Sequence, residues 1–395
     1  MGRFVWKAAA ILMMTASGCA TAPGSVVNAG STGAVTADGG YRAWVTSESA
    51  DEVTLLAFDG DSLRIERRIP VGTMPVEIDG PHGVAVAPDG RFIYVTIAHG
   101  KPLGSLWKID VRSNEVVARA PLGLFPATVA VTPDGETAFI SNFNLHGDHV
   151  PSTVSRIHLP TMGELGRTET CVMPHGSRVN PQGTRHYSVC MMDDLLIEID
   201  VGTGNVVRAF SVARESEGPV SAQAIREHKA MDDAAGAAAE STYVPAPMPA
   251  PGCSPTWAEP SAEGSRIYVT CNRAREVLEI DVATWTLMRR FPTGDAPYNL
   301  ATTPDGRYLL VSLRSRTEPV LEIYDLTTGK RLARMATTTT LAHGIAVTAD
   351  SRFAFVSAEG VGSEAGRVDV FDLVQRRRVA SADVAHQATG IATVP

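Results

Sequence analysis

The apolar and polar positions of this chain repeat with a period of about fifty residues. Each unit has an alternating apolar strand, a Pro-Asp-Gly turn and a second apolar strand, which is the pattern of a β-hairpin. The clearest copies are PHGVAVAPDGRFIYVT (81–96), PATVAVTPDGETAFIS (126–141), PYNLATTPDGRYLLVS (297–312) and AHGIAVTADSRFAFVS (342–357). Weaker copies occupy 174–190 and 254–271. A third strand such as LIEIDV (196–201), a turn and a fourth strand such as VVRAF follow each hairpin.

Four strands repeated in this way predict an all-β fold, a β-propeller with four-stranded blades. The second strand occurs seven times, at Ala43–Val45, Ile93–Val95, Ala138–Ile140, Tyr187–Val189, Tyr268–Thr270, Leu309–Val311 and Ala354–Val356. The first unit (41–73) lacks an inner strand, and the last segment (388–394) supplies a spare one. Pairing these two ends closes the ring and leaves no unpaired edge. We therefore expect a seven-bladed propeller over residues 41–395.

The repeated PDGxxxYVT and IDxxTG elements resemble those of the YVTN family of bacterial propeller proteins, over about 350 residues. This resemblance implies the propeller fold. It says little about activity, because propellers host lactonases, dehydrogenases, metal enzymes and binding modules.

Composition narrows the possible partners. Hydrophobic residues make up 44% of the chain, enough for a sizeable core, and charged residues make up 20%. The net charge of −8 argues against a nucleic-acid surface, which needs clustered Lys and Arg.

The N-terminus has the pattern of a targeting segment. Arg3 and Lys7 precede an apolar stretch, Ala8–Ala16, that is too short to span a bilayer. The following ASGC (16–19) resembles a bacterial lipobox, although Ala16 replaces the usual Leu. The resemblance implies a signal peptide over 1–19, a lipidated Cys19 and a flexible tether over 20–40. The protein would then be lipid-anchored in the cell envelope, at the outer membrane and facing the periplasm. The alternative is an ordinary signal peptide cut nearby.

Four cysteines remain after Cys19, and an even number in an oxidising compartment favours two disulfides. The pairs Cys171–Cys190 and Cys253–Cys271 would each lie within one blade. The pairs Cys190–Cys271 and Cys171–Cys253 would join neighbouring blades. The sequence does not choose between these pairings.

Residues 214–252 separate the fourth and fifth blades. The stretch 220–240 has helical composition, and a proline-rich return follows it. We expect either a disordered insertion or a helix lying over one face of the propeller.

Aligning the hairpins on their turn glycines places a set of side chains at the mouth of the central channel. Eight residues before the glycine, at the start of the inner strand, lie His82, Ala127, His175, Cys253 or Ser254, Tyr298 and His343, with Thr389 closing the ring. On the same face lie His99, Asn144, Met192, Asp193, Arg273, Arg314 and Glu359. The predicted ligand-binding rim consists of His82, His175, Tyr298, His343, Asp193, Arg273 and Arg314.

Two kinds of chemistry fit this rim. His82, His175 and His343 are candidate ligands of copper or zinc, although they lie on separated blades. Alternatively, each His-Gly pair is a packing device, in which the imidazole donates to a backbone carbonyl and the glycine allows close approach. The loop NLHGDH, with His146, Asp148 and His149, is a weaker metal candidate. Arg273, Arg275, Arg314 and Arg316 either bind an anion or are solubilising charges.

The first functional hypothesis is a non-catalytic accessory or scaffold propeller that binds a ligand or an envelope protein partner at the rim. The second is a metal-binding or redox protein that uses the rim histidines. The third, by fold analogy only, is a lactonase-like hydrolase.

Overall fold

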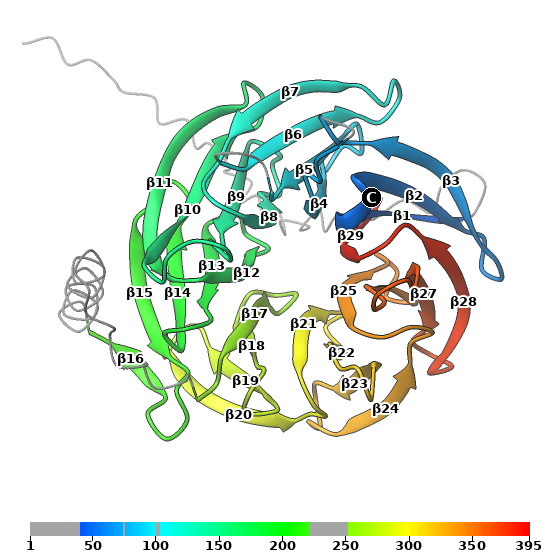
Figure 1. Cartoon of the computed structure of the whole chain (residues 1–395). Coiled ribbons are helices and arrows are strands. Elements are labelled where there is room, and N and C mark those ends of the chain that lie inside the picture. Colours follow the sequence, from blue (N-terminus) through cyan, green and yellow to red (C-terminus); the bar gives the residue numbers. More distant parts are fainter. Residues whose placement is uncertain (1–39, 74–75, 100–102, 222–251) are drawn as a thin grey trace, which may run out of the picture. The chain divides into compact units, whose positions relative to one another are not determined.

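The computed structural model describes residues 40–73, 76–99, 103–221 and 252–395, which fold as seven antiparallel sheets around a central channel (Figure 1). The predicted seven-bladed propeller is therefore confirmed. The predictions for the signal peptide, Cys19 and the tether, and for most of the insertion, concern residues outside these ranges. No helix of the described residues is long and apolar enough to cross a membrane.

The blades are numbered along the chain. Blade 1 comprises β29 (Ala388–Thr393), β1 (Tyr41–Ser47), β2 (Glu52–Phe58) and β3 (Leu63–Pro70), with the 3₁₀ helix η1 (Glu48–Ala50) after β1. Blade 2 comprises β4 (Pro81–Val86), β5 (Phe92–Ile97), β6 (Ser105–Asp110) and β7 (Val116–Pro121). Blade 3 comprises β8 (Pro126–Val131), β9 (Thr137–Asn142), β10 (Pro151–His158) and β11 (Gly163–Val172). Blade 4 comprises β12 (Pro174–Val179), β13 (Arg185–Cys190), β14 (Leu195–Asp200), β15 (Val206–Ser211) and a fifth strand, β16 (Gly218–Val220).

The remaining blades have the same order. Blade 5 comprises β17 (Pro255–Pro260), β18 (Arg266–Cys271), β19 (Glu276–Asp281) and β20 (Thr286–Pro292). Blade 6 comprises β21 (Pro297–Thr302), β22 (Tyr308–Leu313), β23 (Val320–Asp325) and β24 (Arg331–Ala336). Blade 7 comprises β25 (Ala342–Val347), β26 (Phe353–Ala358), β27 (Gly366–Asp372) and β28 (Arg377–Val384).

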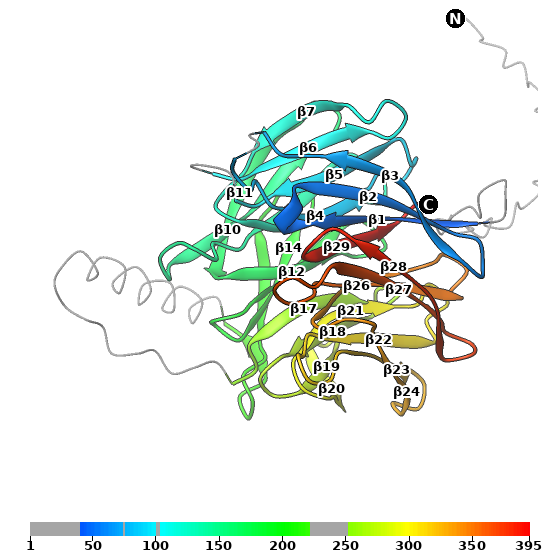
Figure 2. The same ribbon diagram turned by 45° about the vertical axis from the view of Figure 1, so that its right-hand side comes forward.

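The ring closes as the sequence predicts. The C-terminal strand β29 pairs with β1 as the inner strand of blade 1, with Trp44 opposite Ala392 (Figure 2). Because segments near both ends of the chain are needed to complete this blade, blade 1 has four strands only when the ring is closed.

The inner hairpins turn at a position that requires a positive φ angle. Gly90 fills it in blade 2 with φ +68°, and Ser351 fills it in blade 7 with φ +61°. Glycine adopts this conformation without steric cost, which explains its recurrence in the repeat.

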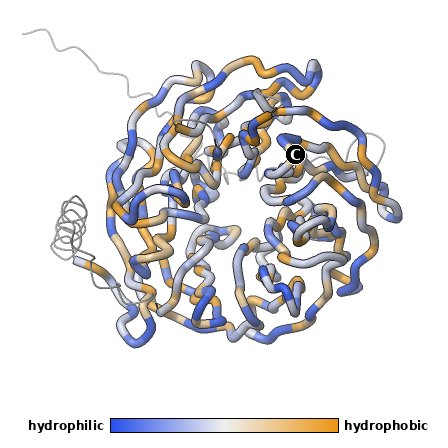
Figure 3. The backbone as a smooth tube through the Cα atoms, viewed as in Figure 1, coloured by the Kyte–Doolittle hydropathy of each residue, from blue (hydrophilic) through white to orange (hydrophobic). Residues whose placement is uncertain are grey.

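The core lies between neighbouring blades. Ala43, Val45 and Phe58 of blade 1 pack against Phe353 and Phe355 of blade 7. Similar clusters join the other blades, and Figure 3 shows hydrophobic segments recurring in every blade. The inner strands are therefore held from both sides by packed sheets, which fixes the residues at their ends.

The two disulfides are Cys171–Cys190 and Cys253–Cys271, which is one of the two predicted pairings. Cys171, in the outer strand β11 of blade 3, is bonded to Cys190 at the end of β13 in blade 4, so this disulfide joins two neighbouring blades and its predicted place within one blade is wrong. Cys253 directly precedes β17 and is bonded to Cys271 of β18, so this disulfide lies in blade 5 as predicted. The alternative pairing, Cys190–Cys271 and Cys171–Cys253, is wrong.

Candidate functional site

We define the rim face as the face of the ring on which the inner strands begin. His82, His175, Tyr298 and His343 are each the second residue of an inner strand, β4, β12, β21 and β25, as the register predicts. The prediction for blade 5 is wrong. Its inner strand begins at Pro255, which pairs with Cys271, so Thr256 occupies the position that we assigned to Cys253 or Ser254. The β17–β18 turn has the same length as the β4–β5 turn, and Thr256 lies eight residues before Gly264, so the prediction erred by treating this turn as longer.

Six aromatic rings form a closed circle of contacts at the rim end of the channel, and we call them the six-ring cluster. Around the circle the members are His82, Phe125, Phe143, His175, Tyr298 and His343, and neighbouring centroids lie 4.7 to 5.9 Å apart. Five of the six residues are buried, and Tyr298 is partly buried. The predicted rim residues therefore meet, but they constrict the channel instead of lining an open mouth.

The hydrogen bonds of His175 define its tautomer. Its Nδ1–H donates to the backbone carbonyl of Thr256 at 2.8 Å, and its Nε2 therefore accepts from the Tyr298 hydroxyl at 3.1 Å. Burial lowers the pKa of His175 to about 4, so the imidazole is neutral at physiological pH. His175 therefore makes the imidazole-to-carbonyl hydrogen bond that the packing interpretation of the His-Gly pairs predicts.

The glycine that follows each rim histidine allows the inner strands to approach closely. A Cβ at Gly83 would lie 2.6 Å from the carbonyl oxygen of Ala127, and one at Gly344 would lie 2.7 Å from that of Thr389. Hydroxyl groups then join the blades, since Thr46 donates to the carbonyl of His82 at 2.7 Å. The close approach predicted for the glycines is confirmed at these positions, whereas the predicted imidazole-to-carbonyl hydrogen bond is found, among the three rim histidines, at His175.

Glu48 holds two histidines at the junction of blades 1 and 2. Its Oε2 lies 2.6 Å from Nδ1 of His82, and its Oε1 lies 2.8 Å from Nε2 of His99. Burial alone would raise the pKa of Glu48, but attraction and hydrogen bonds from the two imidazoles outweigh it, and the pKa lies below its ordinary value. The hydrogen bond to Glu48 raises the pKa of His99 despite partial burial.

Arg314 and Glu359 form an ion pair beside His343. The guanidinium donates to both carboxylate oxygens at 2.5 and 2.8 Å, and it lies 5.4 Å from the centre of the Tyr298 ring. Nε2 of His343 is 3.9 Å from Glu359. Burial, with the nearby His82 and Arg314, holds the pKa of His343 well below its ordinary value, so this imidazole is also neutral.

The other two predicted rim residues lie outside the six-ring cluster. Asp193 accepts a hydrogen bond from the backbone N–H of Val172 at 2.8 Å. Arg273 is exposed in the β18–β19 loop. The neighbouring Asp194 was not predicted, and it accepts hydrogen bonds from the backbone N–H groups of 252–254, which fixes the start of blade 5.

Sequence reasoning also missed Phe125, Phe143 and Glu48. Phe143 directly follows β9 and directly precedes Asn144, which the register places on the rim face, so that register contained the signal. Phe125 precedes its inner strand in a left-handed conformation (φ +46°), and Glu48 lies in η1. Neither conformation is encoded in strand periodicity.

The metal hypothesis gains no geometric support. Among the residues that the structure describes, no group of three His, Cys, Asp or Glu side chains lies close enough together to hold a metal ion. His146 of the NLHGDH loop instead contacts the rings of His99 and Phe125. The roles of His82, His175 and His343 as metal ligands stay a prediction.

Comparisons with known proteins agree on the fold. No family model matches the chain, and no curated protein does, so the resemblance to the YVTN family is not confirmed. Hydrazine synthase of Kuenenia stuttgartiensis is similar in structure with a TM-score of 0.56 and 19% identity, over 77% of this chain and 80% of that one. A functionally unknown protein from Desulfotomaculum acetoxidans has a TM-score of 0.66 and 13% identity, over 89% and 98%. At these identities the similarity shows the propeller fold alone.

Proposed function

We propose that this protein is a non-catalytic accessory propeller, anchored in the cell envelope through a lipidated Cys19, which binds a protein partner on its rim face. The observation that carries the proposal is a cluster of exposed apolar side chains on the loops of blades 2 and 3. A binding or scaffold role also agrees with the propeller fold.

The described chain has ten large hydrophobic side chains exposed to solvent, and five of them lie on rim-face loops of the same two blades. They are Val76, Ile78, Leu103, Leu124 and Leu145, and we call them the apolar loop surface. Val76 is 85% exposed and Ile78 is 56% exposed. Four of the other five are scattered over the outer strands of different blades. Clustered exposed apolar residues mark protein-binding sites more often than single ones do.

Backbone hydrogen bonds join the loops that carry this surface. The N–H of His99 donates to the carbonyl of Asp79 at 2.9 Å, which ties the β5–β6 loop to the β3–β4 loop. Gly104 donates to Gly123 at 2.9 Å, and Asn144 donates to Leu124 at 3.0 Å. The apolar loop surface is therefore preformed, which lowers the entropic cost of binding.

The opposite side of the rim face is polar. A hollow of about 610 Å³ over blades 6, 7 and 1 is lined by Arg314, Arg316, Glu359, Glu364 and His386, among others. An apolar contact area bordered by charged groups is typical of protein–protein interfaces.

The direction of the anchor favours a protein partner over the membrane. Tyr41 begins β1 at the face opposite the rim, where its hydroxyl donates to Asp350 in the β25–β26 turn. A tether that precedes Tyr41 would therefore leave the propeller on that opposite face. The apolar loop surface would then face away from the bilayer.

The test is chemical cross-linking of the full-length chain in its own cell envelope, followed by capture and mass spectrometry. The variant Ile78→Asp/Leu124→Asp places two negative charges on the apolar loop surface. Val117→Asp/Met288→Asp makes the same change at exposed positions of outer strands. We expect one envelope protein to be recovered in similar amounts with the wild type and the control. Its recovery with the Ile78→Asp/Leu124→Asp variant should be at least tenfold lower. Equal recovery with both variants, or no protein that meets this criterion, would overturn the proposal.

A further inference from the structure

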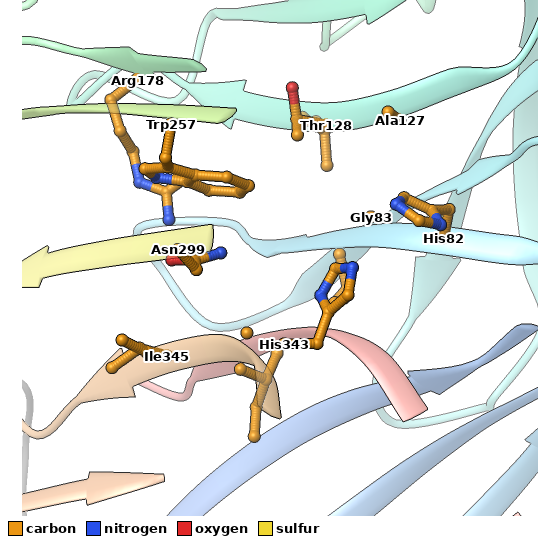
Figure 4. Close-up of a pocket in the computed structure, with 14 residues that line it drawn as sticks. His82, Gly83, Ala127, Thr128, Arg178, Trp257, Asn299, His343 and Ile345 are labelled. Carbon is orange, nitrogen blue, oxygen red and sulfur yellow. The ribbon is translucent and has the colours of Figure 1, made fainter. Parts of the chain in front are cut away.

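Below the six-ring cluster the channel continues as a cavity that reaches the opposite face. Its upper part is lined by Arg178, Trp257, Asn299 and His343, among others (Figure 4). Its lower part has a volume of about 390 Å³ and extends past Val84, Val129, Ile345 and Ile391 to Pro304 and Pro395. Since the six rings constrict the rim end, a ligand would enter this cavity from the opposite face.

Unpartnered polar groups gather in the upper part of this cavity. Oδ1 of Asn299 and Nδ1 of His343 have no hydrogen-bond partner, although the two residues are only 3% and 4% exposed. Figure 4 shows the amide of Asn299 and the ring of His343 projecting towards the same space. Buried polar groups in folded proteins almost always have a partner, so these two groups indicate a missing one.

The charges of the cavity balance each other. Nε of Arg178 lies 3.1 Å from Oε2 of Glu259, and its guanidinium lies 4.6 Å from the centre of the Trp257 ring. Burial raises the pKa of Glu259 to about 7, with Arg178 opposing the shift, so the carboxylate is charged above neutral pH. His343 is neutral, as described above.

We infer that the channel binds a small uncharged molecule with a hydrogen-bonding head group, such as a primary amide or an alcohol, on a short apolar body. The amide of Asn299 and Nδ1 of His343 offer both donor and acceptor positions for the head group. The valine and isoleucine walls contact the apolar body. The charges of Arg178 and Glu259 already cancel each other. A charged head group buried beside this pair would find no opposite charge to offset the cost of its desolvation.

The experiment compares butanamide, butyrate and butylammonium, which have similar size and differ in charge. Each is titrated into the whole protein at about pH 8, where the Arg178–Glu259 pair is charged. The readout is the indole N–H resonance of Trp257, identified with the variant Trp257→Phe. We expect butanamide to shift this resonance at the lowest concentration. The variant Asn299→Leu should weaken the binding at least tenfold, equal to about 1.4 kcal/mol.

Asn299→Leu is expected to fold, because it removes an amide oxygen without a partner and keeps the backbone hydrogen bond to Ser312. Asn205→Leu, at an exposed turn position, is the matched control and should bind butanamide as the wild type does. Three results would overturn the inference. They are no shift of Trp257 with butanamide, tighter binding of butyrate or butylammonium, and unchanged affinity in Asn299→Leu.

Discussion

Removing the disulfide between Cys253 and Cys271 is expected to lower the free energy of unfolding by about 4 kcal/mol. The two cysteines are 18 residues apart, and both are buried in the core between blades 4 and 5. Closing a loop of this length takes about 3 kcal/mol of chain entropy from the unfolded state. Replacing two buried sulfur atoms with alanine adds about 1 kcal/mol of lost packing.

Urea unfolding of the variant Cys171→Ala/Cys190→Ala isolates this cross-link, since Cys253–Cys271 is then the one disulfide left in the described chain. Adding a reductant should lower its unfolding free energy by about 3 kcal/mol, a midpoint shift on the order of 1 M. The reciprocal variant, with Cys171–Cys190 left intact, is the matched control. Its loop spans 19 residues, so its chain entropy agrees within about 0.1 kcal/mol. Equal midpoints with and without reductant would refute the chain-entropy reasoning.

Two substitutions test the rim. Glu48→Gln should cost about 3 kcal/mol near pH 6, because His82 and His99 lose their carboxylate. The pKa of Glu48 is lowered on folding, so its contribution to the unfolding free energy is present above about pH 4.5 and is lost in acid. The pKa of His99 is raised on folding, so its contribution is complete below about pH 6.5 and is lost as the pH rises. The difference in unfolding free energy from the wild type should therefore be largest between these values, and a difference that does not vary with pH would contradict it. Tyr298→Phe should lower the unfolding free energy by about 1–2 kcal/mol, because Nε2 of buried His175 loses its donor; an unchanged urea midpoint would show that this bond contributes nothing.

The sequence was sufficient to predict the blades, the closure of the ring and four members of the six-ring cluster. Side chains along a strand alternate with a fixed period, so counting from the turn glycine places each strand end on a definite face. This is why His82, His175, Tyr298 and His343 meet. The same count from Gly264 gives Thr256 in blade 5, so the expectation of Cys253 or Ser254 there came from overestimating the length of the turn.

The rest of the site depends on loops and packing that periodicity does not describe. Phe125 enters the cluster through a left-handed backbone conformation, and Glu48 reaches His82 from a 3₁₀ turn. The cavity below the rim depends on the register of β12, β17 and β21, whose residues Arg178, Trp257 and Asn299 line it together. None of these three residues is marked by the repeat pattern, because their role in the cavity depends on which side chains the fold places beside them.

The arrangement of the rim histidines also bears on where ligands bind. His175 is satisfied by a backbone carbonyl and the Tyr298 hydroxyl, and His82 is bound by Glu48. These imidazoles serve the closure of the channel, and both nitrogens of His175 and Nδ1 of His82 already have hydrogen-bond partners. His343 differs, because its Nδ1 has no partner and its ring borders the cavity. The six-ring cluster therefore separates two surfaces, and the unpartnered Nδ1 of His343 belongs to the channel side, where we infer the small-molecule site.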